Sequence, residues 1–162
     1  MLIRRSLLMA VLALVPAVAA AQGLVTQKAL SLGLARTIAE AALYECKSKG
    51  FATSVAVVDR AGQVLVLLRD ENASAQTAEM SRRKAYTARM FRTSTMDFQK
   101  RTADPLYAAQ RDVADILALG GGVPIQIGDD VIGGVGSSGS SQVQDDACAR
   151  AGVAKVADLL KP

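Results

Sequence analysis

Residues Gly120 to Gly152 read GGGVPIQIGDDVIGGVGSSGSSQVQDDACARAG, and this stretch decides the fold. Two short apolar runs, 123–127 and 131–135, lie on either side of the turn-forming residues 128–130, which predicts a β-hairpin. A Gly/Ser loop follows, and Ser141 with Gln144 has the spacing of a capping box, so a helix should begin there. So many glycines indicate that backbone packs closely against backbone or against a ligand.

Apolar spacing and turn residues predict further helices and strands outside this stretch. The expected helices span residues 26–49, 77–92 and 105–119, and the expected strands span residues 53–58 and 63–69. Asp104 would be the N-cap of the third helix and Pro105 its first residue. The resulting order, α-β-β-α-α-β-β-α, indicates an α+β fold in which helices flank a small antiparallel sheet.

The first 21 residues have the pattern of a secretory signal peptide. Arg4 and Arg5 precede an apolar run over residues 7–18, and small residues follow it up to Ala21. The run is shorter than the about 20 apolar residues that span a bilayer. We therefore expect cleavage after Ala21, with cleavage after Ala19 as the alternative. The remaining chain, residues 22–162, should form one domain of a periplasmic or secreted protein with no transmembrane segment.

The charge balance argues against nucleic acid as a partner. The full chain has 19 basic and 15 acidic residues and a net charge of +4. Removal of Arg4 and Arg5 with the signal peptide leaves 17 basic and 15 acidic residues, a net charge of +2. The high isoelectric point of the full chain is therefore no evidence for a nucleic-acid-binding surface, and we expect no nucleic acid as a partner.

The two cysteines, Cys46 and Cys148, lie in chain segments predicted to be helical. Each shares a helical face with small or apolar residues, namely Ala35, Ala39 and Ala42 for the first and Gly152, Val156 and Leu159 for the second. An exported protein meets an oxidising compartment, so we expect a disulfide, with two buried thiols as the alternative. The chain has no histidine, and two cysteines alone are a poor metal site.

Lys84 falls on the apolar face of the predicted helix 77–92, about 160° around the helix from Arg82 and Arg89. A buried amine needs a carboxylate partner or a role in a site. Asp59 and Asp70 are the candidate partners. The residue is therefore either half of a structural ion pair or a ligand contact.

Four arginines on the same predicted helix form a second feature. They are Arg82, Arg83, Arg89 and Arg92. They form either a solvated face or a patch that attracts an anion, such as the carboxylate of a substrate.

Two common kinds of site are excluded. The glycines of Gly134-x-Gly136-x-x-Gly139 match the dinucleotide fingerprint, but the chain ends inside the following helix and so has no second parallel strand. Without histidine there is also no imidazole base for a catalytic triad. The residues alone make no positive case for an enzyme.

Several short motifs, in this order, resemble the GlcG/HbpS-type haem-binding family, which in turn resembles the C-terminal domain of PduO-type cobalamin adenosyltransferases. The motifs are Val57-Val58-Asp59-x-x-Gly62, Arg69-Asp70, Lys84-Ala85-x-Thr87-Ala88, Gly121-Gly122-x-Pro124-Ile125 and Ile132-Gly133-Gly134-Val135-Gly136-x-Ser138-Gly139, followed by Asp145. The resemblance covers nearly the whole chain after the signal peptide. It implies a small antiparallel sheet with helices, a homo-oligomer, and haem or a related tetrapyrrole as the ligand.

The resemblance also implies a ligand site. Its expected residues are Asp59, Lys84, Tyr86, Thr87, Gly134, Gly136, Ser138 and Gly139. Because histidine is absent, the axial ligand of the haem iron would be Tyr, Met, Cys or Lys, and Tyr86 is the first candidate. Two other functions stay open: an enzyme that acts on a small carboxylate metabolite through Lys84 and Asp59, and an oligomeric accessory protein of a sensor or an exported enzyme.

Overall fold

The computed structural model describes residue 23 and residues 25–162, so the predicted signal peptide lies outside the described residues. The helices are α1 (Leu32–Ser48), α2 (Gln76–Phe91), α3 (Thr95–Arg101), α4 (Gln142–Ala154) and the short 3₁₀ helices η1 (Ala108–Asp112) and η2 (Ala157–Leu160). The strands are β1 (Ser54–Val58), β2 (Val64–Arg69), β3 (Gly122–Ile127) and β4 (Asp130–Ser138). The predicted order of helices and strands is confirmed.

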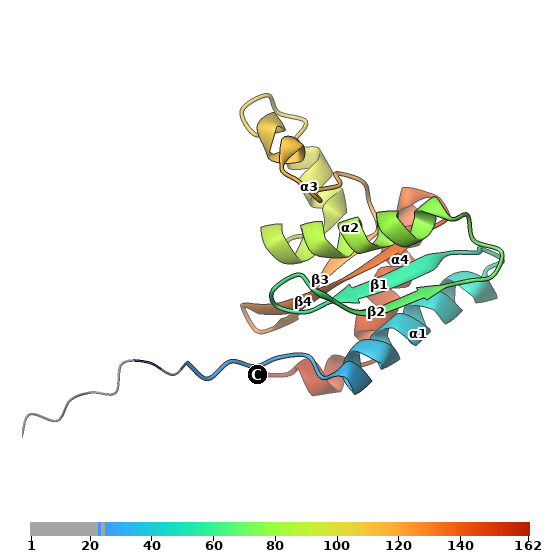
Figure 1. Ribbon diagram of the computed structural model, residues 1–162, viewed down its shortest axis with the longest axis horizontal. Helices are drawn as coiled ribbons and strands as arrows, with labels where there is room; N and C mark the ends of the chain where they lie inside the picture. The colour runs from blue at the N-terminus through green and yellow to red at the C-terminus, as the bar shows by residue number, and fades with distance from the viewer. Residues whose placement is uncertain (1–22, 24) are drawn as a thin grey trace, which may run out of the picture.

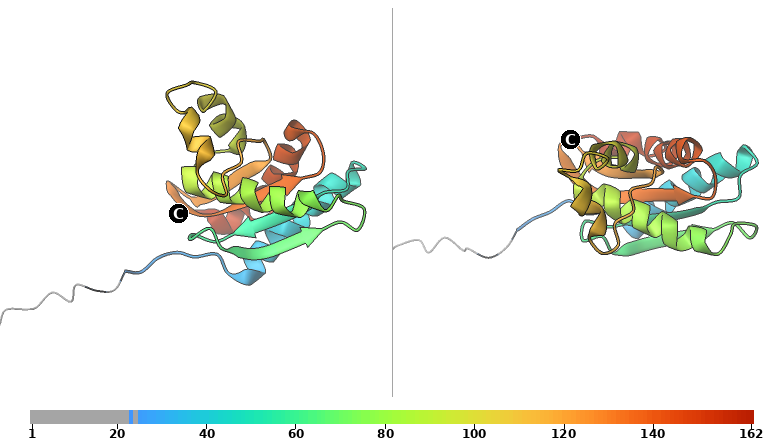
Figure 2. Two further views of the ribbon diagram at one scale, coloured as in Figure 1. Left: turned by 45° about the horizontal axis from the view of Figure 1, so that its top comes forward. Right: turned by 90° about the horizontal axis from the view of Figure 1, so that it is seen from above.

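The four strands form one antiparallel sheet in the order β2-β1-β4-β3. Each predicted hairpin is present, and β1 pairs with β4 in the centre, from Ser54 opposite Ser138 to Val58 opposite Gly134. Helices α1 and α4 pack side by side on one face, and α2 covers the other (Figures 1 and 2). The α+β fold class is therefore confirmed.

Alternation along β1 divides the core into two parts. Val55 and Val57 belong to the main cluster under α1 and α4, whereas Ala56 and Val58 meet Ala85 of α2. All five side chains are fully buried. Successive residues of a strand point to opposite faces, so a continuous apolar run is what a sheet covered on both faces requires.

Serine caps set the start of the two helices on the α1/α4 face. The Ser31 hydroxyl accepts a hydrogen bond from the Leu34 N–H at 3.1 Å, so α1 begins at Leu32, later than expected. The Ser141 hydroxyl accepts from the Gln144 N–H at 3.3 Å, as the capping-box spacing predicts. Both helices thus begin where a side chain satisfies a free N–H group.

The expected third helix over residues 105–119 is wrong. The α-helix between α2 and β3 is α3, which starts earlier, with the Ser94 hydroxyl accepting from the Asp97 N–H, and ends at Arg101. Within residues 105–119 the structure has the short 3₁₀ helix η1. Downstream, the Asp104 carboxylate accepts from the Leu106 N–H in a local turn. The Leu117 N–H and the Ile116 carbonyl bond to Thr87 and Arg83 of α2. These tertiary bonds replace the hydrogen bonds of a helix.

The predicted disulfide is present between Cys46 of α1 and Cys148 of α4, with Cα atoms 5.6 Å apart. Both cysteines are fully buried, as are Ala35, Ala39 and Ala42 on the same face of α1. Small side chains let the two helices approach closely enough for the bridge. The disulfide therefore fastens α1 to α4 on one face of the sheet.

Candidate functional site

Lys84 and Asp145 form an ion pair in the interior. Lys84 Nζ donates to Asp145 Oδ2 at 2.8 Å and to the Ser137 carbonyl at 2.9 Å. The two side chains are 1% and 2% exposed. Burial lowers the pKa of the Lys84 amine, and the Asp145 carboxylate opposes that shift.

The other oxygen of Asp145 is bonded as well. Asp145 Oδ1 accepts from the backbone N–H of Ser140 at 3.1 Å and from its hydroxyl at 2.7 Å. The carboxylate therefore connects three segments: α2 through Lys84, the loop after β4 through Ser140, and α4, which carries it. Its position is fixed by bonds that do not depend on a ligand.

The expected partners of Lys84, Asp59 and Asp70, are wrong. The Asp59 carboxylate accepts from the N–H groups of Ala61 and Gln63 and so closes the β1–β2 turn. Asp70 pairs with Lys47 at 2.8 Å. Asp145 lies three residues before Cys148 on α4, so the two side chains share one face of the helix. Because a disulfide-bonded cysteine should be buried, this spacing is the signal in the sequence that could have identified Asp145 as a buried carboxylate.

A polar pocket of about 250 Å³ lies beside the ion pair. Its lining includes Gln76, Met80, Lys84, Ser138, Gln142 and Asp145. Lys84, Ser138 and Gly139 of the expected site residues line this one pocket. The pocket lies between the first half of α2 and the start of α4.

Thr87, Gly134 and Gly136 lie in the contact between α2 and β4. A Cβ atom at Gly134 would overlap the Ala85 carbonyl, and one at Gly136 would overlap the Ser81 carbonyl. The Thr87 hydroxyl donates to the Arg83 carbonyl and accepts from the Leu117 N–H. The glycines therefore place helix backbone directly on strand backbone, one of the two alternatives that the sequence left open.

Tyr86 and Met90 lie at the other end of α2, over the β1–β2 turn. A Cβ atom at Gly62 would come within 2.5 Å of Met90 Cε and 2.7 Å of the Tyr86 ring, so both side chains rest on this glycine. Asp59 belongs to the same turn. The structure thus separates the expected site residues into a pocket group, a packing group and this turn group.

Next to the turn group in the sequence, strand β2 carries two exposed apolar side chains, Val64 and Leu67. Val64 pairs with Val58 and Leu67 with Ala56, so both lie on the α2 face of the sheet. They are 44% and 43% exposed, because β2 is an edge strand. We call Val64, Leu67, Tyr86 and Met90 the edge surface.

Arg89 lies one turn beyond Tyr86 on α2. Its Nε is buried and has no hydrogen-bond partner among the described residues. Burial lowers the pKa of Arg89, and the positive charges of Arg60 and Arg92 lower it further. Arg60 is bound to Asp130 and Arg92 to the Asp129 carbonyl, so Arg89 is the arginine of the three that an added anion would best satisfy.

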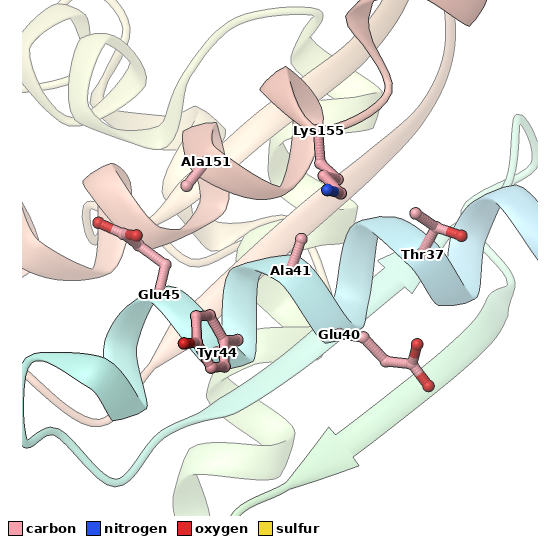
Figure 3. A pocket seen from close by; sticks show the side chains of 7 residues that line it. All are labelled: Thr37, Glu40, Ala41, Tyr44, Glu45, Ala151 and Lys155. Atoms are coloured by element: carbon pink, nitrogen blue, oxygen red, sulfur yellow. The ribbon is translucent and has the colours of Figure 1, made fainter.

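A larger hollow, about 410 Å³, lies between α1 and α4, on the face of the sheet opposite α2. Figure 3 shows Ala41, Tyr44 and Glu45 of α1 beside Ala151 of α4 and Lys155, which directly follows α4. Its lining includes Ala41 and Ala151, and Glu45 pairs with Lys49 at the end of α1. Despite its size, this groove brings together no buried polar groups and is not the candidate site.

The described residues limit which groups could hold haem iron. Within residue 23 and residues 25–162 there is no cluster of three or more acidic, Cys or His residues suited to a metal ion. The disulfide removes both thiols, and Lys84 is committed to Asp145. The half-buried donors that remain on α2 are Tyr86, Met80 and Met90. Also among these residues, no helix has the length and hydropathy to cross a membrane.

The sequence is similar to a known family and to a bacterial relative. Residues 30–154 match the family model described as haem degrading protein HbpS-like. The chain is 32% identical over 114 residues to the protein GlcG of Escherichia coli K12, across 70% of this chain and 84% of GlcG.

Solved structures agree with the sequence matches. The crystal structure of HbpS superposes with a TM-score of 0.78 at 37% identity, covering 83% of this chain and 96% of HbpS. The crystal structure of a PduOC:heme complex superposes with a TM-score of 0.71 at 27% identity, covering 78% of this chain and 94% of the other. One of these two neighbours was therefore solved with haem.

Proposed function

The chain belongs to the HbpS-like family, and on that premise we propose that it is an exported protein that binds haem or a related tetrapyrrole. The observation that carries the proposal is the edge surface with Arg89 beside it. An open apolar face suits a macrocycle, and a half-buried arginine whose Nε has no partner among the described residues suits a propionate. The haem complex of a structural neighbour supports the same ligand class.

The residues of the edge surface and the neighbouring Arg89 would each have a separate role in binding haem. Tyr86 would bind the iron, since tyrosinate is a known haem ligand, and Met90 is the alternative donor next to it. Val64 and Leu67 would cover the ring, and Arg89 would hold a propionate. Bound haem would supply the redox chemistry of its iron.

The pocket at Lys84 is too small to hold the whole macrocycle. Its volume of about 250 Å³ is below the range of about 300–1,000 Å³ that is usual for sites of drug-sized ligands. The Lys84 charge is already balanced by Asp145, so a propionate would gain little there. Both points favour the edge surface for haem.

Titration of haemin into residues 22–162 tests the haem part of the proposal. All described helices and strands lie within these residues. We expect a saturable change of the Soret band with a fixed stoichiometry. A linear, non-saturating response would contradict haem binding.

The export part rests on the pattern of residues 1–21 and on the disulfide, which oxidising compartments favour. Expression of the full chain in a Gram-negative host should place it in the periplasm or the medium, with a mass that corresponds to cleavage after Ala21. A cytoplasmic protein of full mass would contradict export. The homo-oligomer also stays a prediction, which light scattering of the purified protein would test.

A further inference from the structure

The pocket beside the Lys84–Asp145 pair is separate from the edge surface. Lys84 and Met80 contribute to it from the first half of α2, whereas Tyr86 and Met90 rest on Gly62 at the β1–β2 turn. Haem on the edge surface would leave this pocket free. Haem binding at the edge surface therefore does not explain the polar residues of this pocket.

Two buried residues with hydrogen-bond donors, Lys84 and Ser138, line the pocket. An ammonium group has three N–H bonds, and Lys84 uses two of them, to Asp145 and to the Ser137 carbonyl. The hydroxyl of Ser138, a residue that is 2% exposed, is a second donor on the pocket wall. Buried polar groups are nearly always bonded, so the third N–H of Lys84 and the hydroxyl beside it favour an oxygen acceptor as the ligand.

The charges of the lining exclude an anion as the preferred ligand. Lys84 and Asp145 are the charged residues among those that line the pocket, and they neutralise each other at 2.8 Å. Asp145 also lies in the first turn of α4, where its carboxylate neutralises the positive end of the helix dipole that would otherwise attract an anion. A carboxylate ligand would therefore meet a negative charge with no cation left to balance it.

Gln142 supplies a third polar group. Its Oε1 accepts from the Gly120 N–H at 2.8 Å, which orients the amide and leaves its Nε2 as a donor. Three donors around a small cavity suit a molecule with more than one oxygen atom. The volume, about 250 Å³, limits that molecule to a few carbon atoms.

We propose that this pocket binds a small uncharged hydroxycarbonyl compound, whose carbonyl oxygen accepts from Lys84 Nζ and the Ser138 hydroxyl. The hydroxyl group of the ligand accepts from Gln142 Nε2. This site goes beyond the haem proposal, because it uses other residues at the other end of α2.

Three probes of similar size test the proposal: hydroxyacetone, propane-1,2-diol, which lacks the carbonyl, and lactate, which is charged. Each is titrated into ¹⁵N-labelled residues 22–162, and the amide signals of Ser138, Gly139 and Ser140 are followed. We expect saturable shifts with hydroxyacetone and at least about tenfold weaker binding of lactate. Loss of the carbonyl in the diol should weaken binding about threefold or more, the equivalent of one hydrogen bond.

Ser138→Ala and Ser48→Ala form a matched pair of variants. Ser48 lies on α1, outside the pocket, and its hydroxyl donates to the Glu45 carbonyl. Ser138→Ala should weaken hydroxyacetone binding about three- to tenfold, and Ser48→Ala should leave it unchanged. No saturable shift, lactate binding as tight as hydroxyacetone, or equal binding by the two variants would each overturn the proposal. Tyr86→Phe should not alter hydroxyacetone binding, because Tyr86 does not line this pocket. The hydroxyacetone titration therefore tests the pocket even if the protein does not bind haem.

Discussion

Lys84 Nζ lies 2.8 Å from Asp145 Oδ2, and this contact joins helices that pack on opposite faces of the sheet. Helix α2 carries the lysine, and the first turn of α4 carries the aspartate. Both side chains are almost fully buried, so each charge depends on the other for its solvation. The pair therefore fixes the start of α4 relative to α2.

Lys84→Met should destabilise the protein by about 3–5 kcal/mol, because it leaves a buried carboxylate without a counter-charge. The free energy of unfolding in urea measures the loss. The double variant Lys84→Met with Asp145→Asn removes that charge, while the amide oxygen can still accept from Ser140. It should be more stable than the single variant, and a double variant of lower stability would contradict the ion-pair account.

Removal of the disulfide should cost about 2–5 kcal/mol. The two cysteines are 102 residues apart in sequence, so the bridge restricts the unfolded chain strongly. Cys46→Ala with Cys148→Ala, compared with the oxidised wild type in urea, measures the effect. An unchanged unfolding midpoint, or two reactive thiols in the purified wild-type protein, would contradict the bridge.

Gly136→Ala should destabilise the protein by about 1–3 kcal/mol through overpacking, because the new Cβ would overlap the Ser81 carbonyl of α2. Gly33→Ala is the matched control. Gly33 lies in α1 with space around it, so alanine there should stabilise the helix by about 0.5–1 kcal/mol. Thermal unfolding of both variants would show opposite shifts, and a neutral Gly136→Ala would contradict the close approach of α2.

Asp70 should make folding sensitive to acid. Lys47 and the Asn72 N–H hold the pKa of the Asp70 carboxyl below its usual 3.8. The stabilisation is therefore complete above about pH 5 and is lost as the pH falls below 3.8, through the lower pKa of the folded state. Asp70→Asn should be less stable than wild type at pH 7, and the difference should shrink towards pH 3. A difference that grows in acid would contradict the sign of the shift.

The hairpins, α4 and the disulfide could be predicted because local signals determine them. The Gly-Asp-Asp turn sets the β3–β4 hairpin, and Ser141 caps α4. Small residues at helical spacing around Cys46 predicted the face that meets Cys148. In these places the local preference and the final packing agree.

The third helix and the partner of Lys84 depend on tertiary contacts that no local pattern contains. Residues 116 and 117 bond to α2 and leave the helical conformation that Asp104-Pro105 favours. Asp145 reaches Lys84 across 61 positions of sequence. The same reason explains why the expected site residues separate: neighbours on α2 point to different ends of the molecule, Lys84 to the pocket and Tyr86 to the β1–β2 turn.

The central claim is that haem binds at the edge surface through Tyr86, and one comparison tests it most directly. Haemin is titrated in parallel into wild type, Tyr86→Phe and Tyr44→Phe, where Tyr44 is the 74% exposed tyrosine of α1 on the other face. We predict saturable Soret changes in wild type and Tyr44→Phe, and weaker binding with an altered spectrum in Tyr86→Phe. Identical spectra and affinities in all three proteins would contradict the assignment of Tyr86.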